Sequence, residues 1–413
     1  MREKILAIIV MLAFSTTISF AAKRKVLFVI IDGVEPHFLQ DTQPQTIFDI
    51  AGKGNFGYAF CGGQIGMPNE TTTISAVGYA NILTGTWMNK HNVLANSDIH
   101  ANYNYWNIFR IAKEQKRTVT TAVFTSWTDN ITKLVGADGF SNNRLRVDYA
   151  YAGYDLDSKR FPHKPNELQL FDIDSTVCMD AAMCIREKGP DVSWLYLWYS
   201  DDAGHFMGFS PFTRQYLLAE DRQLANVWKV VKERERKYGE EWMVIVTTDH
   251  GRDMLGYGHG GQSETERNIW IATNVKDVNA HFHSPDLSQV DVNPTICRWM
   301  DFHVDRDVLL EQEGMPFIGP IDIDHLRTYR YGECVILQWN AYNTCAQVDI
   351  YVATTNNFKN GGSDKWKKVA CVPASEGRYV IDLAQFGKSS FYKVAVVAPH
   401  NHLSAWYMPQ KDK

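Results

Sequence analysis

The sequence predicts an α/β protein, with a mostly parallel sheet sandwiched by helices, followed by a small C-terminal β-sandwich. Apolar strand-like runs alternate with helical patterns up to about residue 318, as expected when helices cover both faces of a parallel sheet. From about Pro320 the runs become shorter and are separated by turn residues, which is typical of a sandwich. A chain of 413 residues is also long enough to form two cores.

The individual elements follow from these patterns. Strands of the parallel sheet are expected at residues 26–31, 118–124, 192–199, 243–248 and 268–273. Helices are expected at 104–115, 173–188, 211–237 and 289–301, the third beginning after Ser210-Pro211. Sandwich strands are expected at 335–339, 347–353, 366–372, 378–382 and 391–397. Trp339 and Tyr392 resemble the core aromatics of a fibronectin type III-like module. We therefore expect one domain at 22–318 and a second at 319–413.

The N-terminus has the pattern of a secretory signal peptide. Arg2 and Lys4 precede an apolar run at 5–20, and Ser19 and Ala21 fit the small-x-small cleavage pattern. We expect residues 1–21 to be removed, giving a secreted or periplasmic protein without stable membrane insertion. An uncleaved membrane anchor is the alternative, although the run is short for a span.

Charge and cysteine content limit the classes of partner and cofactor. The net charge of −5 gives no broad basic field, so a nucleic-acid polymer is not an expected partner, although a nucleotide is not excluded. The seven cysteines form no CxxC pair, which disfavours a cysteine metal site. We expect them to be buried small hydrophobes, and Cys178 and Cys184 could bridge only if the backbone allows it.

Acidic and histidine side chains follow the predicted strands, at the edge of the sheet where ligands bind in open α/β folds. Each has an ordinary alternative explanation: a turn or cap aspartate, a solvated loop pair, or a structural histidine. Together the three carboxylates and three histidines are enough for two divalent metal sites with three protein ligands each, most simply zinc sites. These residues are Asp32, Asp201, His205, Asp249, His250 and His259.

From about Lys25 to His303 the chain resembles the alkaline phosphatase superfamily, specifically its type I phosphodiesterase/nucleotide pyrophosphatase branch. The motifs that match are the Asp that ends the opening strand, D-x-x-x-H, D-H-G, a late histidine and D-x-x-P-T, at Asp32, Asp201–His205, Asp249–Gly251, His259 and Asp291–Thr295. The resemblance implies an alkaline phosphatase-like catalytic domain. It also implies one metal held by Asp32, Asp249 and His250, and another held by Asp201, His205 and His259.

The resemblance also implies the nucleophile. Counting back from Thr84-Gly85 places it at Ser75, which would be a ligand of the first metal and carry a phospho-serine intermediate. The nearby hydroxyls at 71–73 are the main competitors, and an ordinary helix N-cap is the alternative role for Ser75. A helix N-terminus there is expected to present N–H groups to phosphate. Asn96 matches the asparagine that holds a phosphoryl oxygen, with a turn residue as its alternative role.

Departures from the family pattern narrow the expected substrate. The chain has Ser75 where the branch usually has Thr, and 77–79 read Val-Gly-Tyr instead of Pro-Asn-His. Residues 126–130 lack the Lys and Arg of related phosphomonoesterases, which weakens the case for a doubly charged monoester. Trp127 could stack on a base or sugar, or simply pack. A sulfatase needs Pro and Arg shortly after its modified residue, and 75–79 have neither.

The sequence thus predicts a metal-dependent phosphodiesterase or nucleotide pyrophosphatase acting on a small-molecule phosphate ester or diester. Residues 144–170, rich in Tyr, Asp and Pro, are expected to cover the site. One alternative is a phosphomonoesterase of the same superfamily. Another is a non-catalytic binding protein that uses the C-terminal domain.

Overall fold

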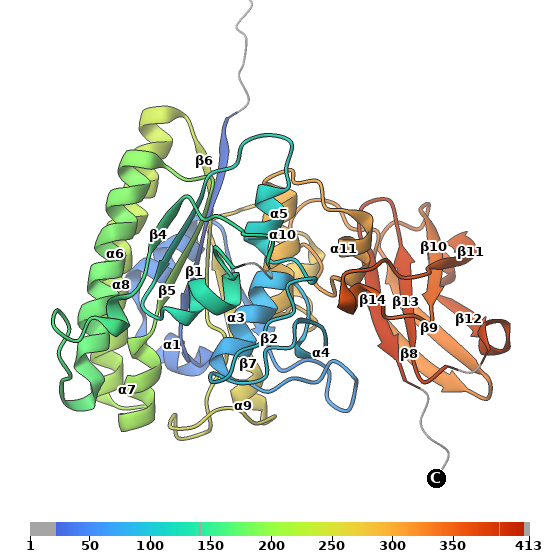
Figure 1. Cartoon of the computed structure of the whole chain (residues 1–413), viewed down its shortest axis with the longest axis horizontal. Helices are drawn as coiled ribbons and strands as arrows, with labels where there is room; N and C mark the ends of the chain where they lie inside the picture. The colour runs from blue at the N-terminus through green and yellow to red at the C-terminus, as the bar shows by residue number, and fades with distance from the viewer. Residues whose placement is uncertain (1–21, 140–141, 388, 409–413) are drawn as a thin grey trace, which may run out of the picture.

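The computed structural model describes residues 22–139, 142–387 and 389–408, so the predicted signal peptide lies outside the described residues. A central sheet is covered by helices on both faces, and two smaller sheets lie beside it at the C-terminal side (Figure 1). Within the described part of the chain, no helix has both the length and the apolar character needed to cross a membrane.

The central sheet has seven strands in the order β2-β7-β6-β1-β5-β3-β4. From β6 to β4 the neighbours are parallel, whereas β7 pairs antiparallel with both β6 and β2. The middle strands are buried almost throughout, as continuous apolar runs in a covered parallel sheet should be. Their bounds are β1 Arg24–Ile31, β2 Asn55–Phe60, β3 Thr121–Thr125, β4 Tyr149–Tyr151, β5 Val192–Leu197, β6 Glu241–Thr247 and β7 Asn268–Thr273.

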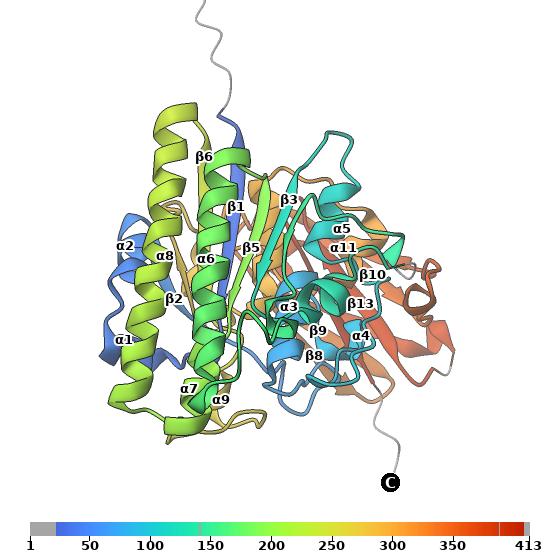
Figure 2. The same cartoon turned by 60° about the vertical axis from the view of Figure 1, so that its left-hand side comes forward.

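Alternate residues of β1 belong to two different cores. Val26, Phe28 and Ile30 belong to the core that includes α3, α5 and α10, whereas Leu27 and Val29 belong to the core that includes α1, α2, α6, α7 and α8. The long helices α6 and α8 run side by side over the second face (Figure 2). The helices are α1 Pro36–Thr42, α2 Gln45–Lys53, α3 Ser75–Thr84, α4 Met88–His91, α5 Ile108–Lys113, α6 Leu168–Lys188, α7 Tyr199–Met207, α8 Pro211–Tyr238, α9 Glu264–Arg267, α10 Val292–Trp299 and α11 Arg306–Glu311.

Two antiparallel sheets, β11-β10-β13-β14 and β12-β9-β8, enclose a separate core. Trp339 and Tyr392 lie in that core, as expected from the sequence. The C-terminal part is therefore a small β-sandwich, and the predicted fold class is confirmed. The bounds are β8 Ile323–Tyr331, β9 Cys334–Ala341, β10 Gln347–Ala353, β11 Lys367–Pro373, β12 Arg378–Asp382, β13 Tyr392–Val397 and β14 His402–Tyr407. The domain boundary at 318/319 stays a prediction.

A buried charge network joins the sandwich to the rest of the chain. Lys393 Nζ on β13 lies 2.5 Å from Glu311 Oε1 and 2.7 Å from Asp364 Oδ2. Lys90 Nζ on α4 donates to the Glu311 carbonyl oxygen at 2.7 Å. Removing one partner of such a network leaves a buried charge uncompensated, which is strongly destabilising. The network therefore fixes the sandwich against α4 and α11.

Several predicted element bounds are wrong by a few residues. The helix expected at 104–115 is shorter, because the Asn107 side chain caps α5 by accepting from Arg110 N at 2.9 Å. The strand expected at 192–199 ends at Leu197, and its last two positions lead into α7. Strands β2, β4, β8 and β14 were not expected from the sequence.

The cysteine expectation was only partly correct. All seven cysteines are described and free; four are buried, Cys334 is half-buried, and Cys345 and Cys371 are exposed. Cys178 and Cys184 do not bridge, because both lie on α6 six positions apart and residues at that spacing are not neighbours on a helix.

Candidate active site

The predicted ligands lie at the carboxyl ends of three adjacent parallel strands, near the lower end of the sheet in Figure 1. Asp32 directly follows β1, and Asp249-His250 follow β6 after one residue. Asp201 and His205 lie on α7, which begins just after β5. The topology of the sheet brings these segments together although they are far apart in the sequence.

Asp32, Asp249 and His250 form the first group. All three side chains are buried, and His250 Nε2 lies 3.4 Å from Asp32 Oδ1 and 3.3 Å from Asp249 Oδ2. Ser75 Oγ lies 3.3 Å from the same nitrogen. The structure thus brings together the residues that the sequence assigned to the first metal and to the nucleophile.

The hydrogen bonds around this group show that it is suited to a cation. His250 Nδ1 lies 2.9 Å from the Gly251 carbonyl oxygen, which can only accept, so we assign the ring proton to Nδ1. Burial lowers the pKa of His250 well below its usual value, so Nε2 carries a lone pair. Asp32 Oδ1 and Asp249 Oδ2 have no hydrogen-bond partner among the described residues. Three potential ligand atoms therefore converge, and a divalent cation would satisfy the two unpartnered carboxylate oxygens.

Asp201, His205 and His259 form the second group. His205 Nε2 lies 3.2 Å from Asp201 Oδ2 and 3.2 Å from His259 Nε2, and His259 Nε2 lies 3.8 Å from Asp201 Oδ1. His259 Nδ1 faces the Thr73 carbonyl oxygen at 2.8 Å, which again directs the Nε2 lone pair toward the group. The His205 side chain is the most exposed of the three, at 41%.

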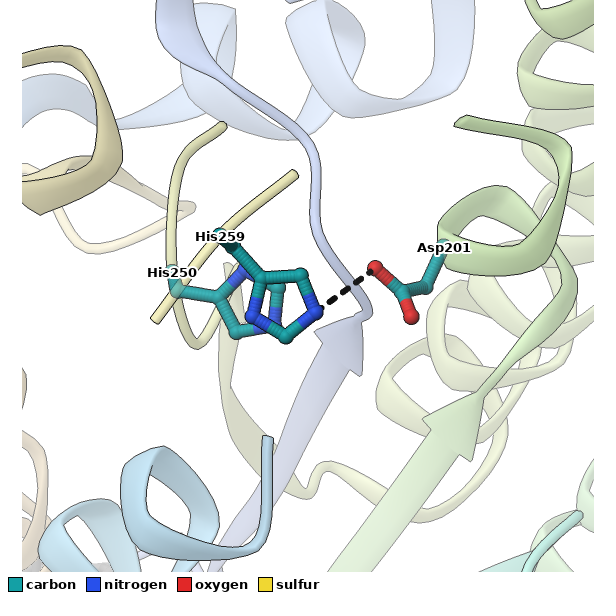
Figure 3. A group of neighbouring side chains, drawn as sticks. All are labelled: Asp201, His250 and His259. Carbon is teal, nitrogen blue, oxygen red and sulfur yellow. Dashed lines mark ion pairs between the residues drawn. The ribbon is translucent and has the colours of Figure 1, made fainter. Parts of the chain in front are cut away.

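The two groups are continuous with each other. The rings of His250 and His259 stack with their centroids 3.8 Å apart, and both face Asp201 (Figure 3). Ligand atoms of Asp201, His250 and His259 also lie within 4.8 Å of one another, as do those of Asp32, Asp249 and His250. The assignment of each ligand to one of two ions, and the identity of the ions, stay predictions.

Electrostatics distinguish the three carboxylates. Burial, together with repulsion from Asp249 and Asp201, raises the pKa of Asp32 well above its usual value. Burial likewise raises the pKa of Asp249 to about 7. Burial also opposes ionisation of Asp201, but the neighbouring Arg252 guanidinium outweighs it and holds the pKa of Asp201 well below its usual value. The first group therefore resists ionisation unless a cation binds, whereas Asp201 is already ionised.

Ser75 is the first residue of α3, and the N-cap position belongs to Ile74, so Ser75 does not act as the N-cap. Asn96 Oδ1 accepts from the next backbone amide, Ala76 N, at 2.9 Å, which places Asn96 beside the head of the helix. Among the neighbouring hydroxyls, Thr71 Oγ1 donates to the Thr72 carbonyl and Thr73 Oγ1 to the Gly261 carbonyl. Thr72 Oγ1 is buried without a hydrogen-bond partner among the described residues, so Ser75 is distinguished by the 3.3 Å contact of its Oγ with His250 Nε2.

The sequence profile described as type I phosphodiesterase/nucleotide pyrophosphatase matches residues 26–256. The chain belongs to this family. The matched range includes Ser75 and five of the six predicted ligands, while His259 lies three residues beyond it. A search of curated proteins finds no match.

Solved structures share the fold of this phosphodiesterase family member. A putative sulfatase from Bacteroides thetaiotaomicron is 12% identical with a TM-score of 0.51, covering 94% of this chain and 85% of that chain. A 2-O GAG sulfatase is 12% identical with a TM-score of 0.50, covering 88% and 86%. Human ectonucleotide pyrophosphatase/phosphodiesterase 5 is 12% identical with a TM-score of 0.47, covering 68% and 96%. At these identities the two sulfatases confirm the fold alone, and family membership makes the chain a phosphodiesterase-like hydrolase.

One important residue of this hydrolase, Arg252, was missed by sequence reasoning. Its side chain is fully buried and bonds Asp201 through both the carboxylate Oδ1 and the backbone oxygen, the latter at 2.6 Å. Nε donates to the Gly33 carbonyl at 2.8 Å, and Nη1 to the carbonyls of Gly256 and Tyr257 at 3.2 Å each. Arg252 thus ties together three segments that carry predicted ligands. A charged residue directly after the D-H-G motif was the available signal.

Two tyrosines were also missed. Tyr196 Oη donates to Asp32 Oδ2 at 2.7 Å, Tyr79 Oη donates to the same oxygen, and the two phenol oxygens are 2.8 Å apart. Both phenols are buried, and burial raises the pKa of each well above its usual value, so they remain donors. They fix Asp32 so that Oδ1 faces His250. Nothing in the sequence distinguishes them from core aromatics of a helix and a strand.

A buried carboxyl pair holds the start of α7. Asp174 accepts from the backbone N–H groups of Trp198 and Tyr199, at 3.0 and 2.8 Å, and Glu220 accepts from Ser200 N at 3.0 Å. Burial raises the pKa of Asp174 to about 6 and that of Glu220 well above its usual value. The pair therefore resists ionisation, and its hydrogen bonds position the helix that carries Asp201.

Trp127 is half-buried and packs against Tyr79 and Trp198, with ring centroids 6.3 and 6.2 Å away. This packing accounts for its position, and a contact with substrate stays a prediction. Part of the 144–170 segment lies nearby, because Asp155 Oδ2 accepts from Thr128 N at 3.1 Å. That this segment covers the site also stays a prediction.

One sizeable cleft lies away from the candidate ligands. A cleft of about 520 Å³ lies between the loop at 60–69 and strands β8 and β14, with Arg267, Arg327 and Trp406 in its walls. None of the six predicted ligands lines it. Its volume is therefore a weaker guide to catalysis than the convergence of unpartnered carboxylate oxygens and histidine lone pairs.

Proposed function

We propose that the chain hydrolyses small-molecule phosphodiesters or nucleotide pyrophosphates through a phospho-Ser75 intermediate, with two divalent cations, most simply zinc, held by the six ligands described above. The observation that carries this proposal is the 3.3 Å distance between Ser75 Oγ and His250 Nε2 at the head of α3. Bound cations supply positive charge that favours ionisation of the Ser75 hydroxyl and neutralises phosphoryl oxygens.

The residues of the chain support an in-line displacement. Ser75 Oγ forms a bond to phosphorus while the bond to the leaving alcohol oxygen breaks, and that oxygen takes up a proton. Water then attacks the same phosphorus, the Oγ–P bond breaks, and Ser75 regains its proton as a phosphomonoester departs. The first turn of α3 offers backbone N–H groups to the remaining oxygens. Because Asn96 Oδ1 already accepts from Ala76, the Asn96 NH2 group can donate to a phosphoryl oxygen.

A diester suits the charges around Ser75 better than a monoester. The stretch 126–130 has no cation, and the five N–H groups of Arg252 already bond carbonyl or carboxylate oxygens of the chain. These groups therefore offer no added cation for the second charge of a monoester. We also propose export after removal of residues 1–21, and no role for a nucleic-acid polymer.

The test compares Ser75→Ala with Thr72→Ala, using bis(p-nitrophenyl) phosphate, p-nitrophenyl phosphate and a nucleotide p-nitrophenyl ester. We expect Ser75→Ala to lose more than about a thousandfold in kcat while its metal content, measured by plasma mass spectrometry, stays near wild type. We expect Thr72→Ala to retain activity. Acid quenching during turnover should leave one phosphoryl group, still bearing the retained ester, on the peptide that contains Ser75. Near wild-type turnover by Ser75→Ala would exclude Ser75 as the nucleophile, and preference for the monoester would overturn the diester assignment.

A further inference from the structure

Six large apolar side chains are exposed on two adjacent segments beside the second ligand group. Phe206, Met207 and Phe209 lie at the end of α7 and just after it, and Met254, Leu255 and Tyr257 lie in the loop after β6; we call these six residues the apolar rim. Met254 is 84% exposed and Leu255 72%, and the other four are between 36% and 47% exposed. Figures 1 and 2 both show α7 and the segment between β6 and α9 at the same lower end of the sheet.

The apolar rim is held in place by hydrogen bonds. Phe209 N donates to the Leu255 carbonyl at 3.0 Å, which joins the two segments. The Asp253 side chain accepts from three backbone amides of the loop, those of Leu255, Tyr257 and Gly258, at 2.7 to 3.1 Å. The loop is therefore fixed in a conformation that keeps Met254 and Leu255 in solvent.

Glycine is required at the point where the two segments meet. Gly256 has a φ of +83°, and a Cβ atom there would lie 2.6 Å from the Phe209 ring. Phe209 in turn stacks on Phe38 with ring centroids 5.0 Å apart. Backbone in this region favours glycine, so the close approach of loop and helix end is built into the sequence.

The apolar rim is continuous with the predicted catalytic ligands. His205 directly precedes Phe206 on α7, and His259 follows Tyr257 after one residue. Arg252 bonds the carbonyls of Gly256 and Tyr257 with the same side chain that bonds Asp201. A group attached to a phosphoryl centre at the second ligand group therefore lies within reach of the rim.

Single exposed apolar residues are normal, but a contiguous exposed patch usually marks a binding surface. A patch that consists of the same two segments as His205 and His259 is placed to receive the substrate itself. We propose that the apolar rim binds an apolar arm of the substrate, so that the enzyme acts on phosphodiesters that carry an alkyl chain or a similar hydrophobic group. This proposal rests on the phosphodiesterase activity proposed above.

The test uses methyl, butyl and octyl esters of a nucleoside 5′-phosphate, in which the alkyl alcohol is the leaving group, assayed by release of the nucleoside monophosphate below the concentrations at which the esters aggregate. For the wild type we expect kcat/KM to rise about tenfold from methyl to octyl, since each methylene removed from water contributes favourably to binding. In the double variant Met254→Ser, Leu255→Ser, the octyl-to-methyl ratio should fall to about one. Met179→Ser is the matched control, because Met179 is also an exposed methionine, at 63%, but lies on α6, and its ratio should stay at the wild-type value.

The outcomes separate the two proposals. A wild type that turns over the methyl ester with no dependence on chain length would overturn the rim proposal and leave the phosphodiesterase intact. No turnover of any diester by the wild type would instead overturn the phosphodiesterase. A third outcome is that kcat/KM does not depend on chain length, while the wild type, but not the double variant, sediments with phosphatidylcholine vesicles. That outcome would assign the rim to membrane docking and also overturn the proposal.

Discussion

Replacing Arg252 by Gln should destabilise the catalytic part of the chain more than a typical single substitution does. Arg252 uses all five N–H groups, on the carbonyls of Gly33, Gly256 and Tyr257 and on two oxygens of Asp201. Gln has one NH2 group and a shorter side chain, so it can replace at most two of these bonds. The substitution also leaves the Asp201 carboxylate buried without its cation.

The magnitude follows from the broken ion pair. Removing one partner of a buried pair costs about 3–5 kcal/mol, because the other charge remains desolvated. For a cooperative unit of roughly 290 residues, the unfolding entropy near the midpoint is about 0.6 kcal/mol/K, so this loss corresponds to a fall of about 5–8 °C in Tm. Bound divalent cations should offset part of the loss, because they compensate Asp201.

Thermal unfolding of the metal-depleted protein, followed by far-UV circular dichroism, measures this effect without the offset. Arg186→Gln is the control, because Arg186 is exposed and lies 3.7 Å from its Glu233 partner, and we expect its Tm to change by less than about 1 °C. Arg252→Lys should give an intermediate loss, because it keeps the charge but cannot reach all three carbonyls. An Arg252→Gln variant as stable as Arg186→Gln would refute the reasoning.

Three further outcomes are expected. Tyr79→Phe should weaken zinc binding at the first group about tenfold in a chelator competition, because Asp32 loses one of the donors that orient it. Glu220→Gln should flatten the fall in Tm between pH 5 and 8. Burial raises the folded-state pKa of Glu220, so the native wild-type protein binds more protons than the unfolded chain. The wild type therefore loses stability as pH rises through that window, and the variant lacks this contribution. Removing divalent cations with EDTA should lower Tm and abolish turnover, both restored by zinc, whereas Asp249→Asn, which leaves the second group intact, should show a smaller EDTA-dependent shift in Tm than the wild type.

The fold was predictable wherever local pattern and burial agree. Strand β7 occupies the predicted residues 268–273, because the short apolar run at 269–272, with polar residues on both sides, favours a buried strand. Its antiparallel direction was not predictable, since a strand's own residues do not encode the direction of its neighbours. Strands β2 and β8 were missed because their residues are partly polar and become strands through pairing with β7 and β9.

The candidate site was also only partly predictable from the sequence. The candidate ligands were predicted because several Asp and His residues follow apolar strands and match motifs of the family that the chain resembles, and their roles as ligands stay predictions. The residues that hold those ligands were not, because Tyr79 and Tyr196 have the appearance of ordinary core aromatics until their hydroxyls are seen to meet at Asp32. Glu220 likewise belongs to a long, mostly polar helix and is recognisable only from its contact with α7. The contacts between a ligand residue and the residues that orient it depend on tertiary packing, which sequence spacing does not record.

The two ligand groups differ in solvent exposure, and this difference determines how a substrate would be oriented in the proposed reaction. Asp32, Asp249 and His250 are sealed from solvent beside Ser75, whereas His205 is partly exposed at the apolar rim. A substrate can approach only from the open side, so its phosphorus must lie between Ser75 and the second group, with its remaining substituents outward. The arm that meets the rim is therefore the one opposite Ser75, the position of the leaving group in an in-line displacement. Chain length on the leaving group should then affect kcat/KM more strongly than the same chain on the retained ester. Equal effects at both positions would show that the rim does not bind the leaving group preferentially.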